Sequence, residues 1–103
     1  MKGSIKNATI ISTKISTDPV LSAWLILEFD GTGQGFGGYC LYNKNHVGDC
    51  GGQFLQRVLE VVGVDEWEKL KGKNIRVDHD MSKIYGIGNI IKNEWFYPSE
   101  ELK

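Results

Sequence analysis

The stretch Asp30-Gly-Thr-Gly-Gln-Gly-Phe-Gly-Gly-Tyr39 decides how this chain can fold. Five glycines fall within eight residues, at positions 31, 33, 35, 37 and 38. Glycine loses the most conformational entropy on folding and adds no side chain to a core. A small domain keeps such a tract where the backbone bends sharply or where another group approaches it closely. The tract therefore predicts either a bent strand or a concave surface whose backbone N–H groups contact a ligand.

The spacing Gly33-x-Gly35-x-x-Gly38 matches the G-x-G-x-x-G pattern of dinucleotide-binding loops. In that motif a helix follows the glycines, and its N-terminus holds a pyrophosphate. Here the next residues, Tyr39-Cys-Leu-Tyr42, have the composition of a strand, and no Gly-Lys-Ser/Thr sequence follows. The sequence therefore argues against a Rossmann or Walker A loop, and we interpret residues 34–42 as a strand distorted by glycine.

Two strands are predicted before the tract. Residues 4–16 are rich in β-branched side chains, with Ala8 and Ile10 on one face. Every second residue from 21 to 29 is apolar, which places Trp24 on the opposite face of the second strand, residues 20–30. A turn at residues 17–19 joins the two strands, so we expect an antiparallel hairpin.

After the tract, the hydrophobic spacing predicts one main helix at residues 53–62. The apolar stripe of this helix consists of Phe54, Leu55, Val58, Leu59 and Val62. Gly63 is well placed to end the helix. A second, short helix is predicted at residues 65–70, with Asp65 as its N-cap.

Two strands are predicted in the last third of the chain. Residues 74–78 form one, with Ile75 and Val77 pointing inward, and residues 83–92 form the other. The element order is therefore β-β-β-α-α-β-β, without the alternation that a parallel sheet requires. We expect an α+β fold, a curved and mostly antiparallel five-stranded sheet with one main helix packed on it. Glycines at 35–38 and 86–88 would allow two strands to coil or bulge.

The size and charge of the chain limit its organisation and its partners. Its 103 residues suffice for one domain, predicted to span residues 1–98, with 99–103 as a C-terminal tail. A net charge of −1 provides no global positive field for duplex DNA or an anionic membrane. No apolar run could cross a bilayer, and the first residues lack the apolar core of a secretory signal. We therefore expect a cytoplasmic protein that binds neither duplex nucleic acid nor a membrane.

No residue pattern predicts a catalytic or metal site. Four side chains are of zinc-binding type, but their spacing matches no common site: Cys40, His46, Cys50 and His79. Cys50 could pair with His46 or His79 as nucleophile and base, yet the sequence identifies no third partner. The Asp78-His-Asp80 segment is better explained as a strand end and turn. We expect no enzyme activity, no cofactor and no metal.

Aromatic side chains and cations supply the candidate ligand site. Trp24 could serve as a stacking platform for a base or as an anchor for a partner protein, and it could equally be buried if both sheet faces are covered. The cations best placed to bind an anion beside such a platform are Lys44, Arg57, Arg76 and Lys83. The predicted ligand-binding set is Trp24, Gln34, Gly35, Phe36, Gly37, Tyr39, Arg57, Arg76 and Tyr85.

Several of these motifs together resemble a family of small proteins encoded by phages and prophages. The likeness extends from about Trp24 to Pro98 and rests on six segments: Gly33-Gln-Gly-Phe-Gly-Gly-Tyr39, Phe54-Leu-x-Arg57-Val-Leu-Glu-Val-Val-Gly63-Val, Trp67-Glu-x-Leu-Lys-Gly72-Lys, Arg76-Val, Ile87-Gly-Asn89 and Trp95-Phe-x-Pro98. The segment 43–50 carries no motif of the family. The family brings a context and no mechanism: small phage proteins without catalytic residues often inhibit host defence.

The residues and the resemblance together lead to one expectation and one alternative. We expect a non-enzymatic phage protein that counteracts defence in the host-cell cytoplasm by sequestering a cyclic or ADP-ribose-type nucleotide. Arg57 or Arg76 and the N–H groups of residues 33–38 would hold phosphate, and a homo-oligomer would supply a deep pocket. The alternative is an inhibitor that binds a host defence protein, as anti-CRISPR proteins do, or a small interaction module without a ligand. It predicts an exposed apolar patch around Trp24 or Trp95.

Overall fold

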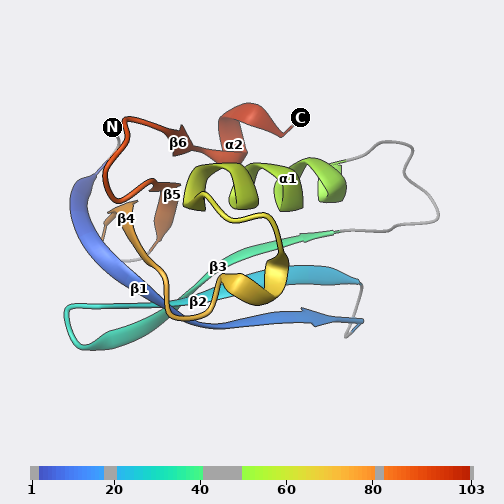
Figure 1. Ribbon diagram of the computed structural model, residues 1–103, viewed down its shortest axis with the longest axis horizontal. Coiled ribbons are helices and arrows are strands. Elements are labelled where there is room, and N and C mark those ends of the chain that lie inside the picture. The colour runs from blue at the N-terminus through green and yellow to red at the C-terminus, as the bar shows by residue number, and fades with distance from the viewer. Residues whose placement is uncertain (1–2, 18–20, 41–49, 81–82, 103) are drawn as a thin grey trace.

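The computed structural model describes residues 3–17, 21–40, 50–80 and 83–102, with the side chains of residues 39, 40, 50 and 51 outside that description (Figure 1). In these residues the elements follow in the order β1 Ser4–Ser16, β2 Ser22–Phe29, β3 Thr32–Cys40, α1 Cys50–Val62, a 3-10 turn Trp67–Lys69, β4 Asn74–His79, β5 Ile84–Gly88, β6 Trp95–Phe96 and α2 Pro98–Glu101. All strand pairs are antiparallel, in the order β3-β2-β1-β4-β5-β6. The α+β class with an antiparallel sheet and one main helix is confirmed, and the sheet has six strands where five were predicted.

The thirteen-residue strand β1 joins the two halves of the sheet. It pairs with β4 from Ser4 to Thr9 and with β2 from Thr9 to Ser16. A bulge between Ile10 and Ser12 shifts the register just beyond the point where the partner changes. Figure 1 shows β1 in blue, curving through the whole sheet, with α1 packed over one side. We call the side toward α1 the inner face and the opposite side the outer face.

The hairpin between β2 and β3 has a two-residue loop. Asp30 and Gly31 both have positive φ, 54° and 75°, which is the requirement of a type I′ turn. Phe29 therefore pairs with Thr32, and β3 begins two residues earlier than predicted.

Three phenylalanine rings form the centre of the inner core. Phe36 from β3, Phe54 from α1 and Phe96 from β6 have ring centroids 5.8–6.4 Å apart. Because β3 and β6 are the two edges of the sheet, contact between Phe36 and Phe96 requires the sheet to curl around α1. Each such aromatic pair contributes about 0.5–1.5 kcal/mol beyond the burial of its area.

The helix α1 starts three residues before its predicted position, at Cys50, and ends where predicted. Gly63 has φ of 88°, and its N–H and that of Val64 both donate to the carbonyl of Leu59, at 2.9 and 3.1 Å. Val61, which the predicted stripe omits, is fully buried. The predicted second helix at 65–70 is only the 3-10 turn, and Asp65 does not cap it. Its carboxylate instead accepts a hydrogen bond from Lys69 Nζ at 2.8 Å.

The predicted last strand, residues 83–92, was too long. β5 ends at Gly88, and Asn89 turns the chain so that Trp95–Phe96 returns beside it as β6. The side chain of Asn89 stabilises this turn. Its Oδ1 accepts hydrogen bonds from the N–H groups of Ile91 and Lys92, at 2.9 and 2.8 Å. Residues 99–101, which the sequence places in a tail, belong to α2.

The glycine tract makes room for the indole of Trp24 on the outer face. A Cβ at Gly35 would lie 3.1 Å from Cε3 of Trp24, and one at Gly38 would lie 2.4 Å from Cζ2. Gly37 and Gly38 also have positive φ, opposite the bulge between Ala23 and Trp24. The ring therefore packs directly on the backbone of β3. The glycine tract both bends the strand and provides the surface on which Trp24 packs.

The same arrangement occurs in the other half of the sheet. A Cβ at Gly88 would lie 2.7 Å from ring atoms of Trp95, and one at Gly86 would lie 2.7 Å from the ring of Tyr97. A register shift between Asp78 and His79 accompanies these glycines. Both glycine-broken strands predicted from the sequence are therefore covered by aromatic rings of a neighbouring segment.

Replacement of Gly38 by alanine tests this packing. Gly38→Ala should lower the free energy of unfolding by about 2–4 kcal/mol, because the methyl group meets the indole of Trp24 and the backbone has positive φ. The matched control is Gly33→Ala, where the nearest atoms are 4.0 Å away. That variant should stay within about 1 kcal/mol of the parent. Equal urea midpoints for the two variants would contradict the proposed packing.

Candidate ligand-binding groove

A groove of about 170 Å³ lies beside Trp24. Its walls are formed by Trp24, Gln34, Gly35, Phe36, Gly37, Lys83 and Ile84. The first five belong to the predicted ligand-binding set, and β2 and β3 bring them together. Lys83 and Ile84 reach the groove because the curl of the sheet places the start of β5 next to β3. We call this feature the Trp24 groove.

The indole of Trp24 is the central surface of the groove. It is 36% exposed although one side lies against Gly35 and Gly38. Among the described residues, no aromatic ring or cationic group stacks on it. Trp24 therefore keeps a partly exposed aromatic surface beside the groove, and the alternative that it is a core residue is wrong.

Two lysines lie on opposite sides of Trp24. Lys14 is its direct partner in the pairing of β1 with β2 and is exposed. Lys83 lines the groove from the far side of β3, with Nζ 5.7 Å from the ring centroid of Tyr85. In the described part of the chain, neither ammonium group takes part in an ion pair. Both charges are therefore available to an anionic ligand.

Tyr85 lies next to the groove and is held by Asp80, the residue that follows β4. Its hydroxyl donates to the carboxylate of Asp80, and this hydrogen bond raises the pKa of Tyr85. The other oxygen of Asp80 accepts from the N–H of Lys83 at 3.1 Å. These hydrogen bonds to Asp80 fix the position of the Lys83 backbone, from which its side chain extends.

Arg76 is placed away from the groove and holds the turn between β5 and β6. Its Nε donates to the carbonyl of Asn89 at 2.7 Å, and its Nη2 to that of Lys92 at 2.9 Å. The guanidinium carbon lies 4.9 Å from the ring centroid of Trp95. Arg76 therefore acts within the fold, since its donors and its stacking face are both engaged.

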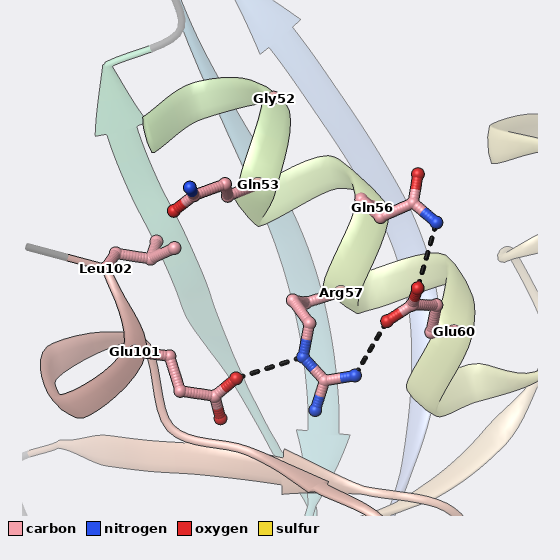
Figure 2. Close-up of a pocket in the computed structure, with 7 residues that line it drawn as sticks. All are labelled: Gly52, Gln53, Gln56, Arg57, Glu60, Glu101 and Leu102. Atoms are coloured by element: carbon pink, nitrogen blue, oxygen red, sulfur yellow. Dashed lines mark hydrogen bonds and ion pairs between the residues drawn. The ribbon is translucent and has the colours of Figure 1, made fainter. Parts of the chain in front are cut away.

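Arg57 lines a different and larger hollow of about 510 Å³, between α1 and α2 (Figure 2). Figure 2 shows its guanidinium between two carboxylates, with Nη1 2.7 Å from Glu60 and Nε 3.0 Å from Glu101. Its Nη2 also donates to the carbonyl of Trp95 at 2.9 Å. The hydrogen bond to Glu60, more than any other contact, raises the pKa of Arg57. These acidic neighbours neutralise the cation, so this hollow offers little to an anion.

The other predicted residues differ in their contribution. Phe36 is only 4% exposed, and its ring packs against Phe54 and Phe96. Gln34 is half-buried and brings an amide to the groove wall. Tyr39 pairs with Ala23 through its backbone, but its side chain lies outside the described residues. Lys14 was not predicted as a site residue, although its register with Trp24 could have indicated it.

The Asp78-His-Asp80 segment has a structural role in the described part of the chain. Asp78 is fully buried, and its carboxylate accepts hydrogen bonds from Gly3 N–H at 2.8 Å and from the Tyr97 hydroxyl at 2.7 Å. His79 packs on Phe29 with ring centroids 4.6 Å apart. The predicted pairing of Cys50 with His46 or His79 falls outside the described residues, because the side chain of Cys50 and the whole of His46 lie outside them.

Comparison with known proteins finds no matching family model, curated protein or solved structure. In the part of the chain that the structure describes, no three His, Cys, Asp or Glu side chains gather in a way that could hold a metal ion. No helix there is long and apolar enough to cross a membrane. The geometry of the Trp24 groove is therefore the feature from which a function is inferred.

The buried hydroxyl of Tyr97 gives the protein a pH dependence at high pH. Burial, followed by the bond to Asp78, raises the pKa of Tyr97 far above its ordinary value. The folded state therefore holds this proton more tightly than the unfolded chain, where tyrosine titrates near pH 10. The contribution to stability is complete below about pH 10 and is lost as the pH rises further.

Comparison of the parent with Tyr97→Phe across pH 8–12 measures this contribution. We expect Tyr97→Phe to be less stable below about pH 10, because Asp78 loses a buried donor. The difference in unfolding free energy should shrink at higher pH. A difference that stays constant up to about pH 12 would show that the hydroxyl does not titrate in this way.

Proposed function

We propose that this chain is a non-enzymatic binding protein that captures a nucleotide-type ligand in the Trp24 groove. The observation that carries the proposal is one partly exposed indole between two lysines that form no ion pair with any described residue. An indole stacks well on a planar group, and ammonium groups attract phosphate. A nucleotide combines a planar base with phosphate in one molecule.

Trp95, the other tryptophan whose ring packs on a glycine, supports this choice of ligand. At Trp95, the protein itself supplies a planar group, the guanidinium of Arg76. At Trp24 no such group is present among the described residues, but Lys14 and Lys83 would repel a cationic one. The groove therefore favours a ligand that is planar and anionic over one that is planar and cationic.

The cations that we assign to phosphate differ from those expected from the sequence. Arg57 and Arg76 are engaged with carboxylates, carbonyl groups or an aromatic ring, so we assign this role to Lys14 and Lys83. Trp24 and Gln34 keep the roles expected from the sequence. The phage resemblance provides the biological context, in which the protein counteracts host defence by sequestering a nucleotide signal. The expected homo-oligomer stays a prediction.

A thermal-shift screen tests the proposal directly. The panel should contain cyclic dinucleotides, ADP-ribose derivatives, short single-stranded oligonucleotides, nucleoside monophosphates and the matching nucleosides. We expect phosphate-bearing members to raise the melting temperature and nucleosides to have less effect. Trp24→Ala should remove the shift, whereas Lys92→Gln, a charge change on the turn between β5 and β6, should preserve it. The absence of a shift with every member of the panel would refute nucleotide capture by the free protein.

A specific observation also favours the alternative, an inhibitor that binds a host protein. Ile91 is 86% exposed, and neighbouring Ile90 is 38% exposed. The turn that carries them is held by Asn89 and by Arg76, which fixes the carbonyls at both ends. A rigidly held, exposed isoleucine is the kind of anchor that fits a partner's apolar pocket.

The two candidates predict opposite results from one pair of variants. In bacteria that carry a defence system, the protein should restore phage plaque formation under either hypothesis. If it captures a nucleotide, Trp24→Ala should abolish the protection and Ile91→Asp should preserve it. If it blocks a protein through the turn, the results should be reversed. Circular dichroism of both purified variants verifies that each is folded.

A further inference from the structure

The Trp24 groove is too small to enclose a whole nucleotide. Its volume is about 170 Å³, whereas pockets that bury small ligands measure roughly 300–1,000 Å³. A base lying on Trp24 would occupy it and leave the sugar and the phosphate outside. A free nucleotide would therefore gain few further contacts, but a longer chain could continue along the surface on both sides.

The two lysines are arranged for a chain that crosses the strands. Lys14 lies on β1, Trp24 on β2, and Lys83 lies beyond β3. Adjacent strands are about 4.8 Å apart, so this line runs across the sheet and is longer than two strand spacings. Every internal base of a nucleic acid strand has a phosphate on each side, whereas a nucleoside monophosphate has only one. The positions of the lysines match the first arrangement.

The outer face of β3 offers little steric hindrance to such a chain. Gly33, opposite Glu28 in the neighbouring strand, has open space above it, whereas Gly35, opposite Ile26, lies under the ring of Trp24. β3 is also an edge strand of the sheet. Beside Trp24 the outer surface is therefore mostly backbone, which a sugar-phosphate chain can approach closely.

The position of the groove in the fold points to the same ligand by analogy. The first five strands are arranged as β3-β2-β1-β4-β5, with a helix between β3 and β4, which is the connectivity of an OB-type barrel. Such barrels bind oligonucleotides on the face of strands 2 and 3 and with the loop between strands 4 and 5. Here β2, β3 and the end of the loop between β4 and β5 border the Trp24 groove. Fold analogy alone does not establish function, but it agrees with the geometry.

We infer that the ligand of the Trp24 groove is a single-stranded nucleic acid, an inference that rests on the proposed function and specifies its substrate class. One base stacks on Trp24, and the phosphates on either side contact Lys14 and Lys83. Stacking accepts any base, and Gln34 is the one uncharged polar side chain among the described groove residues. The binding is therefore of low sequence specificity.

Fluorescence anisotropy with labelled oligonucleotides of about 12 nucleotides tests this inference. Oligothymidylate and oligouridylate serve as the DNA and RNA probes, with a duplex of the same length as the control. Trp24→Ala should weaken binding by about tenfold or more, and Trp24→Phe should restore part of the loss. Two phosphate contacts predict a slope of log K against log salt near −1.4, since each contact in a single strand contributes about −0.7.

The lysine variants make the test quantitative. Lys14→Gln and Lys83→Gln should each reduce the slope by about 0.7, whereas Lys92→Gln should leave it unchanged. If a cyclic dinucleotide or a mononucleotide binds as tightly as the single strands, the inference fails and the proposed function survives. If the duplex binds equally well, the inference also fails. If neither strands nor nucleotides bind, both the inference and the proposed function fail.

Discussion

The contact between the indole of Trp24 and the bare backbone of β3 determines the character of the outer face. The ring occupies space that Cβ atoms at Gly35 and Gly38 would need, so the strand beneath it must be glycine-rich. Gly37 and Gly38 also permit the positive φ values and the bulge that bend β3. Room for a large flat ring thus explains the glycines at positions 35 and 38, whereas Gly31 is required by the two-residue turn that starts the strand.

The curl of the sheet connects this local contact to the rest of the molecule. Phe36 and Phe96 belong to opposite edge strands, yet both rings pack with Phe54 of α1. Because the apolar inner face is closed in this way, the start of β5 lies beside β3, and Lys83 borders the same groove as Trp24. The core therefore positions the groove, although no fully buried side chain needs to touch a ligand.

Local pattern was sufficient for much of the fold, and it failed where long-range contacts decide the outcome. Alternation identified β1 and β2, and helical spacing identified α1, because each signal lies within one segment. The turn at Asn89 was missed, since Arg76 from another strand fixes it. Within the site, the residues of β2 and β3 were found together because they form one hairpin. The structural roles of Arg57 and Arg76 could not be predicted from the sequence, since most of the groups they bond lie in distant segments.

The arginines and the lysines discussed above have different roles: Arg57 and Arg76 stabilise the fold, whereas Lys14 and Lys83 border the groove. Arginine holds several donors in a fixed plane, which suits the carbonyl groups and rings that Arg57 and Arg76 organise. Lysine carries a mobile point charge on a flexible stem, which can follow a phosphate whose position varies. A chain of net charge −1 has no general attraction for polyanions. Under the proposed function it still binds one at the Trp24 groove, where Lys14 and Lys83 flank an exposed ring and stacking supplies the affinity that charge alone does not.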